Sequence, residues 1–152
     1  SHVENINLFV AGTGEKRILD RFSAYDSRVK VLGWLRAPDI HSLLKMSDLT
    51  LLPSTCHENS PVVIFESYQQ GTPVVGSDFG GIPELIDERE TGYLFSRIDP
   101  FDLAEKVILH FARPAAEQRR MRQRSYAYVD TQLSYEQHID GILKIYQEAL
   151  DR

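Results

Sequence analysis

The sequence predicts an α/β fold in which a mainly parallel sheet lies between two layers of helices. Short apolar segments, typical of buried strands, alternate along the chain with longer segments that have the periodicity of amphipathic helices. Polar or glycine-containing loops follow most of the expected strands. Strands and helices that alternate at this spacing form parallel sheets covered on both faces, and ligands bind such sheets at the carboxyl ends of the strands.

The first expected strand, residues 6–10, leads into a glycine-containing turn. Gly12 and Gly14 lie in this turn, but the third glycine of a dinucleotide-binding fingerprint is absent. A plain tight turn and a nucleotide-binding turn are therefore both compatible with the sequence here. The helix that follows is expected over residues 15–25. Its expected buried side chains are Ile18, Leu19 and Phe22.

The second expected strand, residues 29–32, is followed by the segment GWLR. Trp34 in this segment is compatible with a surface-capping aromatic as well as with a ligand-binding residue. Asp39 is expected to cap the next helix, which ends near Met46. The segment DLTLLPS then forms the third strand and leads into the most informative part of the chain, residues 51–84.

The start and the end of a helix are marked within residues 51–84. After a polar loop, Ser60 is expected as the N-cap and Pro61 as the first helical residue. The helix is expected to end at Gly71, because glycine readily adopts the left-handed conformation of a C′ residue. The next strand starts at Pro73, and the GGIPE segment after it is expected to form a tight turn.

The loop and first helical turn at residues 59–62 predict a phosphate site, because unpaired N–H groups and the helix dipole both attract anions at a helix N-terminus. Glu58 lies in this loop, and Glu66 lies in the helix, where side chains lean toward the N-terminus. A carboxylate repels phosphate but offers several acceptor sites to sugar hydroxyls. The sequence therefore predicts a ligand that carries both phosphate and hydroxyl groups. The neighbouring His57 is interpreted as a loop histidine.

This combination resembles the group 1 family of retaining glycosyltransferases, in the nucleotide-sugar-binding C-terminal half of their GT-B fold. The family pattern of two glutamates separated by seven residues and followed by GTPVV is present as ENSPVVIFE at residues 58–66 and then SYQQGTPVV. Its later elements are present as GGIPE at residues 80–84 and GYLF at residues 92–95. The resemblance covers nearly the whole chain and implies a Rossmann-like three-layer sandwich, one half of a GT-B fold.

The activity implied by the resemblance is transfer of a hexose from a UDP- or GDP-sugar to an acceptor hydroxyl, in the synthesis of a polysaccharide, lipopolysaccharide or glycolipid. The anomeric configuration is retained, and no metal or other cofactor is required. Glu58 and Glu66 would be the catalytic pair: Glu58 would contact hydroxyls of the donor sugar and Glu66 the ribose, and retention does not imply that either is a covalent nucleophile. Stabilising the departing diphosphate is the main catalytic task. The other donor-binding residues that the resemblance implies are Gly12, Gly14, Trp34, Leu35, Asn59, Ser60, Pro61, Val62 and Val63.

Residues 1–152 are expected to form a single donor-binding domain. In the family, an acceptor-binding N-terminal domain comes first, followed by a strand, a glycine–arginine turn and a Lys-Gly pair whose cations bind the diphosphate. Neither the domain nor this strand is visible before Asn5. The resemblance thus implies that the chain has the N-terminal domain as its partner, binds its donor weakly and transfers no sugar when alone.

The composition agrees with one globular domain and excludes several classes of protein. A net charge of -5 argues against broad nucleic-acid binding. The single cysteine, Cys56, excludes an internal disulfide and a cysteine-based zinc site, and it fits a reducing compartment. No apolar run reaches the roughly 18 residues of a membrane span, and no signal peptide is expected. The expected location is therefore the cytoplasm.

The last third of the chain is expected to be helical. Asp99 and Pro100 predict the start of one helix, and Ser134 with Gln137 forms a capping box for the last one. A cluster of arginines lies between them. It is compatible with contact to the cytoplasmic face of an anionic membrane but is more typical of a solvated helix face. The arginines are Arg113, Arg119, Arg120, Arg122 and Arg124.

Two other kinds of function are compatible with the fold class. A sugar-nucleotide epimerase or a phosphorylase-like enzyme shares the fold, but a phosphorylase needs a pyridoxal-binding lysine, and none of the five lysines lies in a suitable glycine-rich loop. A non-catalytic, flavodoxin-like interaction domain needs a phosphorylatable aspartate at a strand end and an acidic pair after the first strand. The segment FVAGTG contains neither feature.

Overall fold

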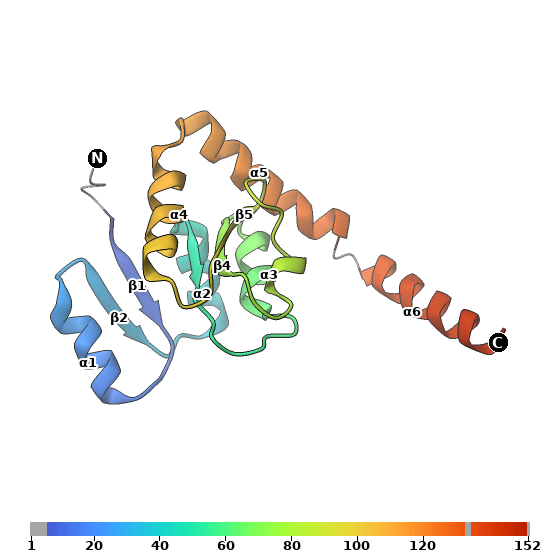
Figure 1. Ribbon diagram of the computed structural model, residues 1–152, viewed down its shortest axis with the longest axis horizontal. Coiled ribbons are helices and arrows are strands. Elements are labelled where there is room, and N and C mark those ends of the chain that lie inside the picture. Colours follow the sequence, from blue (N-terminus) through green and yellow to red (C-terminus); the bar gives the residue numbers. More distant parts are fainter. Residues whose placement is uncertain (1–5, 133–134, 152) are drawn as a thin grey trace. The chain divides into compact units, whose positions relative to one another are not determined.

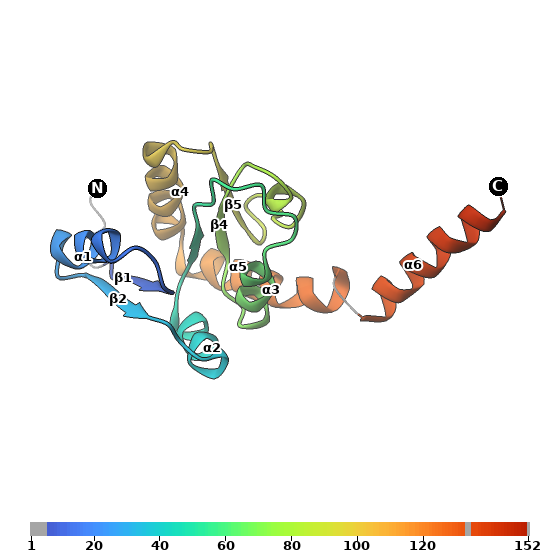
Figure 2. The same ribbon diagram turned by 90° about the horizontal axis from the view of Figure 1, so that it is seen from below.

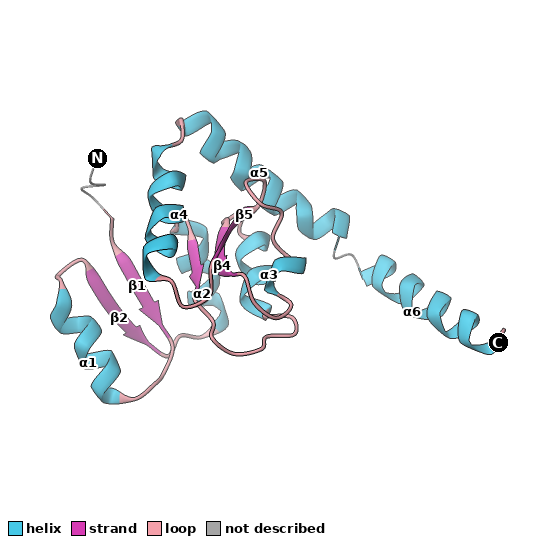
Figure 3. Cartoon of the chain, in the orientation of Figure 1, coloured by secondary structure: helices cyan, strands magenta, loops and turns pink. Residues whose placement is uncertain are grey.

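The computed structural model describes residues 6–132 and 135–151, in two compact units that divide between Met46 and Ser47 (Figure 1). Each unit combines strands with helices (Figure 3). Within the described part of the chain, the strands form one two-stranded and one three-stranded sheet. Every strand pair in these two sheets is parallel, as the alternation of strands and helices predicts.

The first unit consists of β1 (Leu8–Ala11), α1 (Lys16–Tyr25), β2 (Val29–Gly33) and α2 (Ala37–Met46). β1 starts at Leu8, two residues later than predicted, and pairs with β2 so that Leu8 lies opposite Val29. The prediction that α1 buries three apolar side chains is wrong. Ile18 and Phe22 are 46% and 41% exposed, and only Leu19 is half-buried. The two strands of this unit offer too narrow a surface to cover all three.

The start of α2 also differs from the prediction. The helix begins at Ala37, and Pro38 lies in its first turn, where the fixed φ of proline favours helix. Asp39 therefore lies inside the first turn and not at the cap. Its carboxylate pairs with the guanidinium of Arg36 at 3.0 Å.

The second unit begins with β3 (Thr50–Leu52), α3 (Val62–Gln69), β4 (Val74–Ser77), the short 3-10 helix η1 (Ile82–Glu84) and β5 (Gly92–Phe95). It continues with α4 (Pro100–Ala112), α5 (Ala115–Gln132) and α6 (Tyr135–Leu150). The sheet order is β3-β4-β5, with Thr50 opposite Val74 and Val74 opposite Gly92. The central strand, β4, is buried along its whole length.

Helices cover both faces of the three-stranded sheet, as predicted. Val74 of β4 packs with Ile64 and Tyr68 of α3, whereas the next residue, Val75, packs in a second cluster with Tyr93 and with leucines of α4. Successive strand residues point to opposite faces, so the two clusters are two separate cores. Figure 2 shows α3 on one side of β4 and α4 on the other. This unit is thus a three-layer sandwich.

α5 contacts the amino ends of the strands. Nη1 of Arg122 donates a 2.6 Å hydrogen bond to the carbonyl oxygen of Ser47, just before β3. Oγ of Ser125 donates a 3.2 Å hydrogen bond to the carbonyl oxygen of Thr91, just before β5. The carboxyl ends of the same strands lead into the loops that carry Glu58 and its neighbours.

Two of the predicted helix boundaries of the second unit are confirmed, and a third lies outside the described residues. Gly71 follows α3 with a φ of 67°, and its N–H donates to the carbonyl oxygen of Tyr68 at 2.8 Å, which confirms the left-handed helix end. Asp99 caps α4, because its Oδ1 accepts the N–H of Phe101 at 2.9 Å. Ser134 of the predicted capping box lies outside the described residues.

Among the described helices, none combines the length and the hydropathy needed to cross a membrane.

Candidate donor site

The candidate site of the second unit lies at the carboxyl edge of the β3-β4-β5 sheet. Three loops meet there: one after β3, one after β4 and one after β5. Oγ of Ser77, the last residue of β4, donates a 2.8 Å hydrogen bond to the carbonyl oxygen of Ser54 in the first loop. The N–H of Asp78 donates to the carbonyl oxygen of Phe95 at 2.8 Å. The three loops are therefore held in fixed relation by the sheet below them.

The two glycines of the GGIPE turn pack directly against the backbone around Glu58. Gly80 has a φ of 62°, and a Cβ on it would lie 2.6 Å from the carbonyl oxygen of Glu58. A Cβ on Gly81 would overlap the carbonyl oxygen of Asn59. The N–H of Gly81 donates to the carbonyl oxygen of Glu58 at 2.7 Å. Glycine is thus required at both positions, and the turn fixes the backbone of Glu58.

The side chain of Glu58 is half-buried and held by its own loop. Oγ of Ser54 donates a 3.0 Å hydrogen bond to Oε1 of Glu58. A carboxylate has about four acceptor sites, so this single bond leaves capacity for hydroxyl groups of a ligand.

The N-terminus of α3 differs from the prediction by one residue. Pro61, and not Ser60, is the N-cap: its ψ of 117° is extended, so the helix starts only at Val62. The carbonyl oxygen of Pro61 accepts the N–H of Ile64 at 3.1 Å. No hydrogen-bond partner within the described chain reaches the N–H groups of Asn59, Ser60, Val62 and Val63. Four free donors at a helix N-terminus are the arrangement that suits an anion.

Glu66 is half-buried and lies on α3, one turn after Val62. Residues four apart share one side of a helix, and the side chain of Val62 is 64% exposed. The opposite side of the helix packs into the core through Ile64, Ser67 and Tyr68. The second unit thus places Glu58 in the loop before α3, Glu66 on α3 itself, and the four free N–H groups between them in the chain.

The remaining predicted site residues lie in the first unit. The N–H of Gly12 donates to the carbonyl oxygen of Gly33 at 2.7 Å, and both glycines have a positive φ. The Gly12–Gly14 turn and the segment of Trp34 and Leu35 therefore lie side by side at the carboxyl edge of the β1-β2 sheet. The indole of Trp34 is 70% exposed, and Leu35 is half-buried.

Two side chains at the carboxyl edge of the β3-β4-β5 sheet were not singled out from the sequence. The ring of Phe79 contacts the ring of His57, with 4.3 Å between the centroids. The guanidinium carbon of Arg97 lies 3.9 Å from the centroid of the same Phe79 ring. One sequence feature is relevant to Arg97. No lysine or arginine lies between Lys45 and Arg89, so the stretch that contains Glu58 and Glu66 has no cation of its own.

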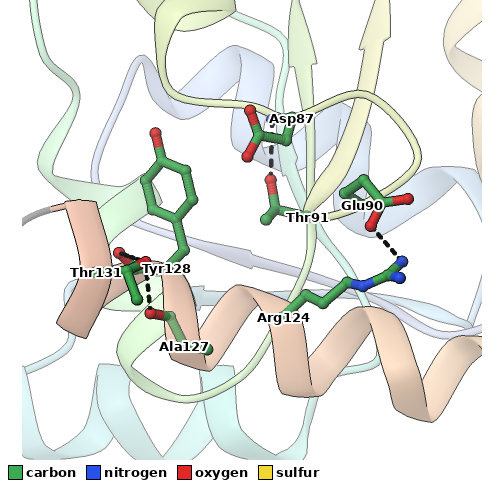
Figure 4. A pocket seen from close by; sticks show the side chains of 7 residues that line it. All are labelled: Asp87, Glu90, Thr91, Arg124, Ala127, Tyr128 and Thr131. Carbon is green, nitrogen blue, oxygen red and sulfur yellow. Dashed lines mark hydrogen bonds and ion pairs between the residues drawn. The ribbon is translucent and has the colours of Figure 1, made fainter.

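A cavity of about 280 Å³ lies apart from these residues, between α5 and the turn that precedes β5 (Figure 4). Thr91 is buried there, and its Oγ1 lies 2.9 Å from the Tyr68 hydroxyl. Burial raises the pKa of Tyr68 well above its ordinary value, so the phenol stays protonated. Arg124 pairs with Glu90 across the rim. The cavity is lined by Asp87, Glu90, Thr91, Arg124, Ala127, Tyr128 and Thr131.

The arginine cluster of residues 113–124 is not uniformly solvated. Arg122 and Arg124 bind Ser47 and Glu90, and the guanidinium of Arg113 lies over the Tyr93 ring with 5.4 Å to its centroid. Arg119 and Arg120 are exposed. Among the described side chains, no group of three or more histidine, cysteine, aspartate or glutamate residues is arranged to hold a metal ion.

Comparison with known sequences finds relatives along most of the chain. The family described as Glycosyl transferases group 1 matches residues 1–112. The N-acetyl-alpha-D-glucosaminyl L-malate synthase of Bacillus anthracis is 33% identical over 125 residues, which are 82% of this chain and 32% of that protein. The D-inositol 3-phosphate glycosyltransferase of Thermobifida fusca is 33% identical over 117 residues, 76% of this chain and 26% of that one. The chain thus spans a third or less of these relatives.

Solved structures share the fold. The Anabaena protein Alr3699/HepE in complex with UDP superposes with a TM-score of 0.80 at 22% identity, over 94% of this chain and 41% of that one. Sucrose-phosphate synthase from Thermosynechococcus elongatus gives a TM-score of 0.81 at 21% identity, over 98% of this chain and 40% of that one. These likenesses confirm the predicted Rossmann-like α/β half domain.

Proposed function

Because the chain belongs to the group 1 glycosyltransferases, we propose that it is the donor-binding half of a retaining enzyme that moves a hexose from a UDP- or GDP-sugar to an acceptor hydroxyl. The observation that carries this proposal is the arrangement at residues 58–66. Four backbone N–H groups without a partner in the described chain lie between Glu58 and Glu66. Such a site suits a ligand with a diphosphate in the middle and hydroxyl groups on both sides of it.

The N–H groups of Asn59, Ser60, Val62 and Val63 would receive the negative charge of the diphosphate, with the dipole of α3 behind them. Pro61 has no N–H and contributes by ending the loop in an extended conformation. Electrostatic stabilisation of the departing diphosphate is the step that such preorganised donors favour most, because they need no reorganisation when charge develops.

Glu58 would accept hydrogen bonds from hydroxyls of the transferred sugar, and Ser54 and Gly81 hold it for this role. Glu66 would accept hydrogen bonds from the ribose of the nucleotide. Neither carboxylate acts as a nucleophile in this proposal. Gly12, Gly14, Trp34 and Leu35 of the first unit are further donor-binding candidates that membership of the family implies, and the indole of Trp34 is exposed.

The identity of the donor rests on related proteins. Alr3699/HepE has been crystallised with UDP and with UDP-glucose. This supports a uridine nucleotide, and GDP remains the alternative.

The acceptor would be bound by a separate N-terminal domain of the enzyme, so we propose that residues 1–152 bind donor but transfer no sugar alone. No cofactor takes part in this scheme, and the enzyme would work in the cytoplasm or at the cytoplasmic face of a membrane.

The proposal is tested by titrating the isotope-labelled 152-residue chain with UDP and with GDP and recording amide NMR spectra. One of the two nucleotides should shift the resonances of residues 58–66 and 12–14, and Glu66→Ala should abolish the response. Glu105→Ala, which removes an exposed carboxylate from α4, is the matched control and should respond like the unmodified chain. Unchanged spectra at millimolar nucleotide, or an unaffected Glu66→Ala variant, would contradict donor binding by this chain.

A further inference from the structure

The Phe79 ring joins side chains from all three loops at the carboxyl edge of the β3-β4-β5 sheet. His57 comes from the loop after β3, Phe79 from the loop after β4 and Arg97 from the loop after β5. The His57 and Phe79 rings are 4.3 Å apart and inclined at 53°, and the Arg97 guanidinium carbon lies 3.9 Å from the Phe79 centroid. We call these three side chains the His57–Phe79–Arg97 cluster.

The cluster borders the candidate donor site. His57 directly precedes Glu58, and Phe79 directly precedes Gly80. Gly80 and Gly81 pack on the backbone of Glu58, so the chain segments that carry His57 and Phe79 are joined where the predicted sugar-binding carboxylate lies. A group bound by the cluster would therefore be a neighbour of a ligand bound at Glu58.

The backbone around Arg97 is held in a fixed and strained turn. The N–H of Ser96 donates to Oδ2 of Asp102 at 2.6 Å, and the N–H of Asp99 donates to the carbonyl oxygen of Ser96 at 3.0 Å. Between them, Ile98 has a φ of 65°, which a β-branched residue rarely adopts. Such strain persists where the surroundings over-determine the conformation, and it is commonest at functional sites. The turn thus fixes the position from which the Arg97 side chain reaches Phe79.

Charge makes Arg97 unusual at this edge of the sheet. Two of the three loops, and the whole chain between Lys45 and Arg89, contain no lysine or arginine. The acidic residues of the same stretch are Asp48, Glu58, Glu66, Asp78, Glu84, Asp87 and Glu88. A phosphate approaching Glu58 therefore needs a compensating cation, and the loop after β5 brings one across the sheet edge.

The guanidinium of Arg97 is suited to this task. It is exposed, and within the described part of the chain it forms no salt bridge or hydrogen bond. Stacking on an aromatic ring uses the flat face of a guanidinium, while the N–H donors point outward in its plane. These donors match two oxygens of one phosphate group, which is the geometry that makes arginine the preferred residue for bidentate phosphate binding.

We propose that Arg97, positioned by Phe79, forms a phosphate-binding subsite beside Glu58. This inference deepens the proposed function, on which its biological meaning rests. The phosphate could belong to the nucleotide-sugar donor or to a phosphorylated acceptor. His57 packs on the same ring and contributes to holding Phe79 in place.

The direct test uses pyrophosphate as the probe, with the backbone amide resonances of residues 57–60 and 96–98 as reporters in NMR titrations of the 152-residue chain, because these amides are present in every variant. Arg97→Gln should weaken pyrophosphate binding about fivefold or more, since a charge-assisted bidentate contact is lost. Arg119→Gln is the matched control, because it removes another exposed positive charge, from α5. Its affinity should stay within about twofold of the unmodified chain.

Phe79 is tested as a positioning residue with two substitutions. Phe79→Leu keeps an apolar side chain but removes the ring, so pyrophosphate binding should weaken while thermal stability changes little. Phe79→Tyr keeps a ring for the guanidinium and should restore the affinity. If Phe79 had only a structural role, the two variants would differ in thermal stability and not in pyrophosphate affinity. Equal pyrophosphate affinity in Phe79→Leu and Phe79→Tyr would overturn the positioning role.

Two further ligands identify the source of the phosphate. If Arg97→Gln weakens UDP binding, the subsite holds the donor diphosphate, and if it weakens only glucose 6-phosphate binding, the subsite holds an acceptor phosphate. Both results support the subsite. An unaffected Arg97→Gln variant, an equal loss in Arg119→Gln, or no binding of pyrophosphate by the unmodified chain would overturn it. If Arg97→Gln loses pyrophosphate binding but the unmodified chain shows no response to UDP or GDP at residues 58–66, the subsite stands and only the proposed function is refuted.

Discussion

The N–H of Gly81 donates a 2.7 Å hydrogen bond to the carbonyl oxygen of Glu58. This bond connects the GGIPE turn with the first glutamate of the candidate site, although the two motifs lie on either side of α3 and β4. A side chain at Gly81 would overlap the carbonyl oxygen of Asn59. The two motifs therefore act as one structural unit, in which the turn determines the backbone position of the carboxylate.

The first prediction concerns Gly81→Ala. The added methyl group must push the turn away from residues 58–59, so the free energy of unfolding should fall by about 1–3 kcal/mol, as in other overpacked sites. The nucleotide response at residues 58–66 should be lost in the folded fraction as well. Urea unfolding and NMR titration with UDP and GDP measure the two effects.

Gly141→Ala provides the control for this substitution. Gly141 lies inside α6, and a Cβ on it meets no atom within 4 Å. Alanine favours helix over glycine, so this variant should be as stable as the unmodified chain or more stable by up to about 1 kcal/mol. A Gly81→Ala variant that retains both stability and the nucleotide response would show that the turn does not control the Glu58 loop.

The second prediction separates sugar binding from nucleotide binding at Ser54. Ser54→Ala removes the 3.0 Å hydrogen bond to Glu58 and the 3.3 Å hydrogen bond that Oγ of Ser54 accepts from the N–H of Cys56, and it leaves α3 and its free N–H groups intact. The affinity for a UDP-sugar or GDP-sugar should fall about fivefold, which corresponds to loss of one hydrogen bond. The affinity for the bare nucleotide should not change. Isothermal titration calorimetry with the two ligands gives both constants.

Ser54→Thr retains the hydroxyl and should restore sugar-nucleotide binding. Ser42→Ala serves as the control, since the Ser42 hydroxyl also donates one hydrogen bond, to the carbonyl oxygen of Pro38 at 2.8 Å, but lies on α2. Equal losses for the sugar nucleotide and the bare nucleotide in Ser54→Ala would mean that Ser54 supports the loop as a whole and not the Glu58 carboxylate.

Local sequence patterns were sufficient for the elements around the candidate site. The apolar segments of β3 and β4, the left-handed Gly71 and the Asp99 cap each depend on a few neighbouring residues, and the structure confirms all of them. Parallel pairing followed from the alternation of strands with helices. These features were predictable because each is determined within one or two turns of chain.

Features that depend on contacts distant in sequence were not predictable in the same way. The exposed Ile18 and Phe22 have helical spacing, but the sheet beneath them is too narrow to bury them. Periodicity reports which side of a helix is apolar and not whether a surface exists to cover it. The contact of Arg97 with Phe79 likewise requires knowledge of which loops meet at the sheet edge.

The third prediction assigns a structural role to one member of the arginine cluster. Arg122→Gln removes the part-buried 2.6 Å hydrogen bond to the carbonyl oxygen of Ser47. Because the donor is charged, the loss should lower the free energy of unfolding by about 1.5–3 kcal/mol. Arg119→Gln, at an exposed position of the same helix, should change it by less than about 0.5 kcal/mol. The stabilities are measured by urea unfolding, and equal stabilities of the two variants would contradict the assignment.

The last prediction concerns pH and the buried His110. Its imidazole is 1% exposed and its Nδ1 has no hydrogen-bond partner in the described part of the chain, while its ring lies 5.9 Å from the Tyr93 ring. Burial lowers the pKa of His110 to about 4, against the opposing effect of Asp48. The folded state thus favours the neutral imidazole. The unfolded chain binds a proton near pH 6.5, so the stability due to His110 is complete above that pH and is lost as the pH falls toward 4.

Between about pH 7 and about pH 5, this linkage should lower the free energy of unfolding by about 2 kcal/mol. His110→Leu fills a similar volume without a titrating group, so its stability should fall less over the same interval. His138→Gln removes an exposed histidine of α6 and should retain the full decrease. Urea unfolding at several pH values measures all three slopes. An unmodified chain and a His110→Leu variant with the same pH dependence would mean that His110 is protonated with similar ease in the folded and unfolded states.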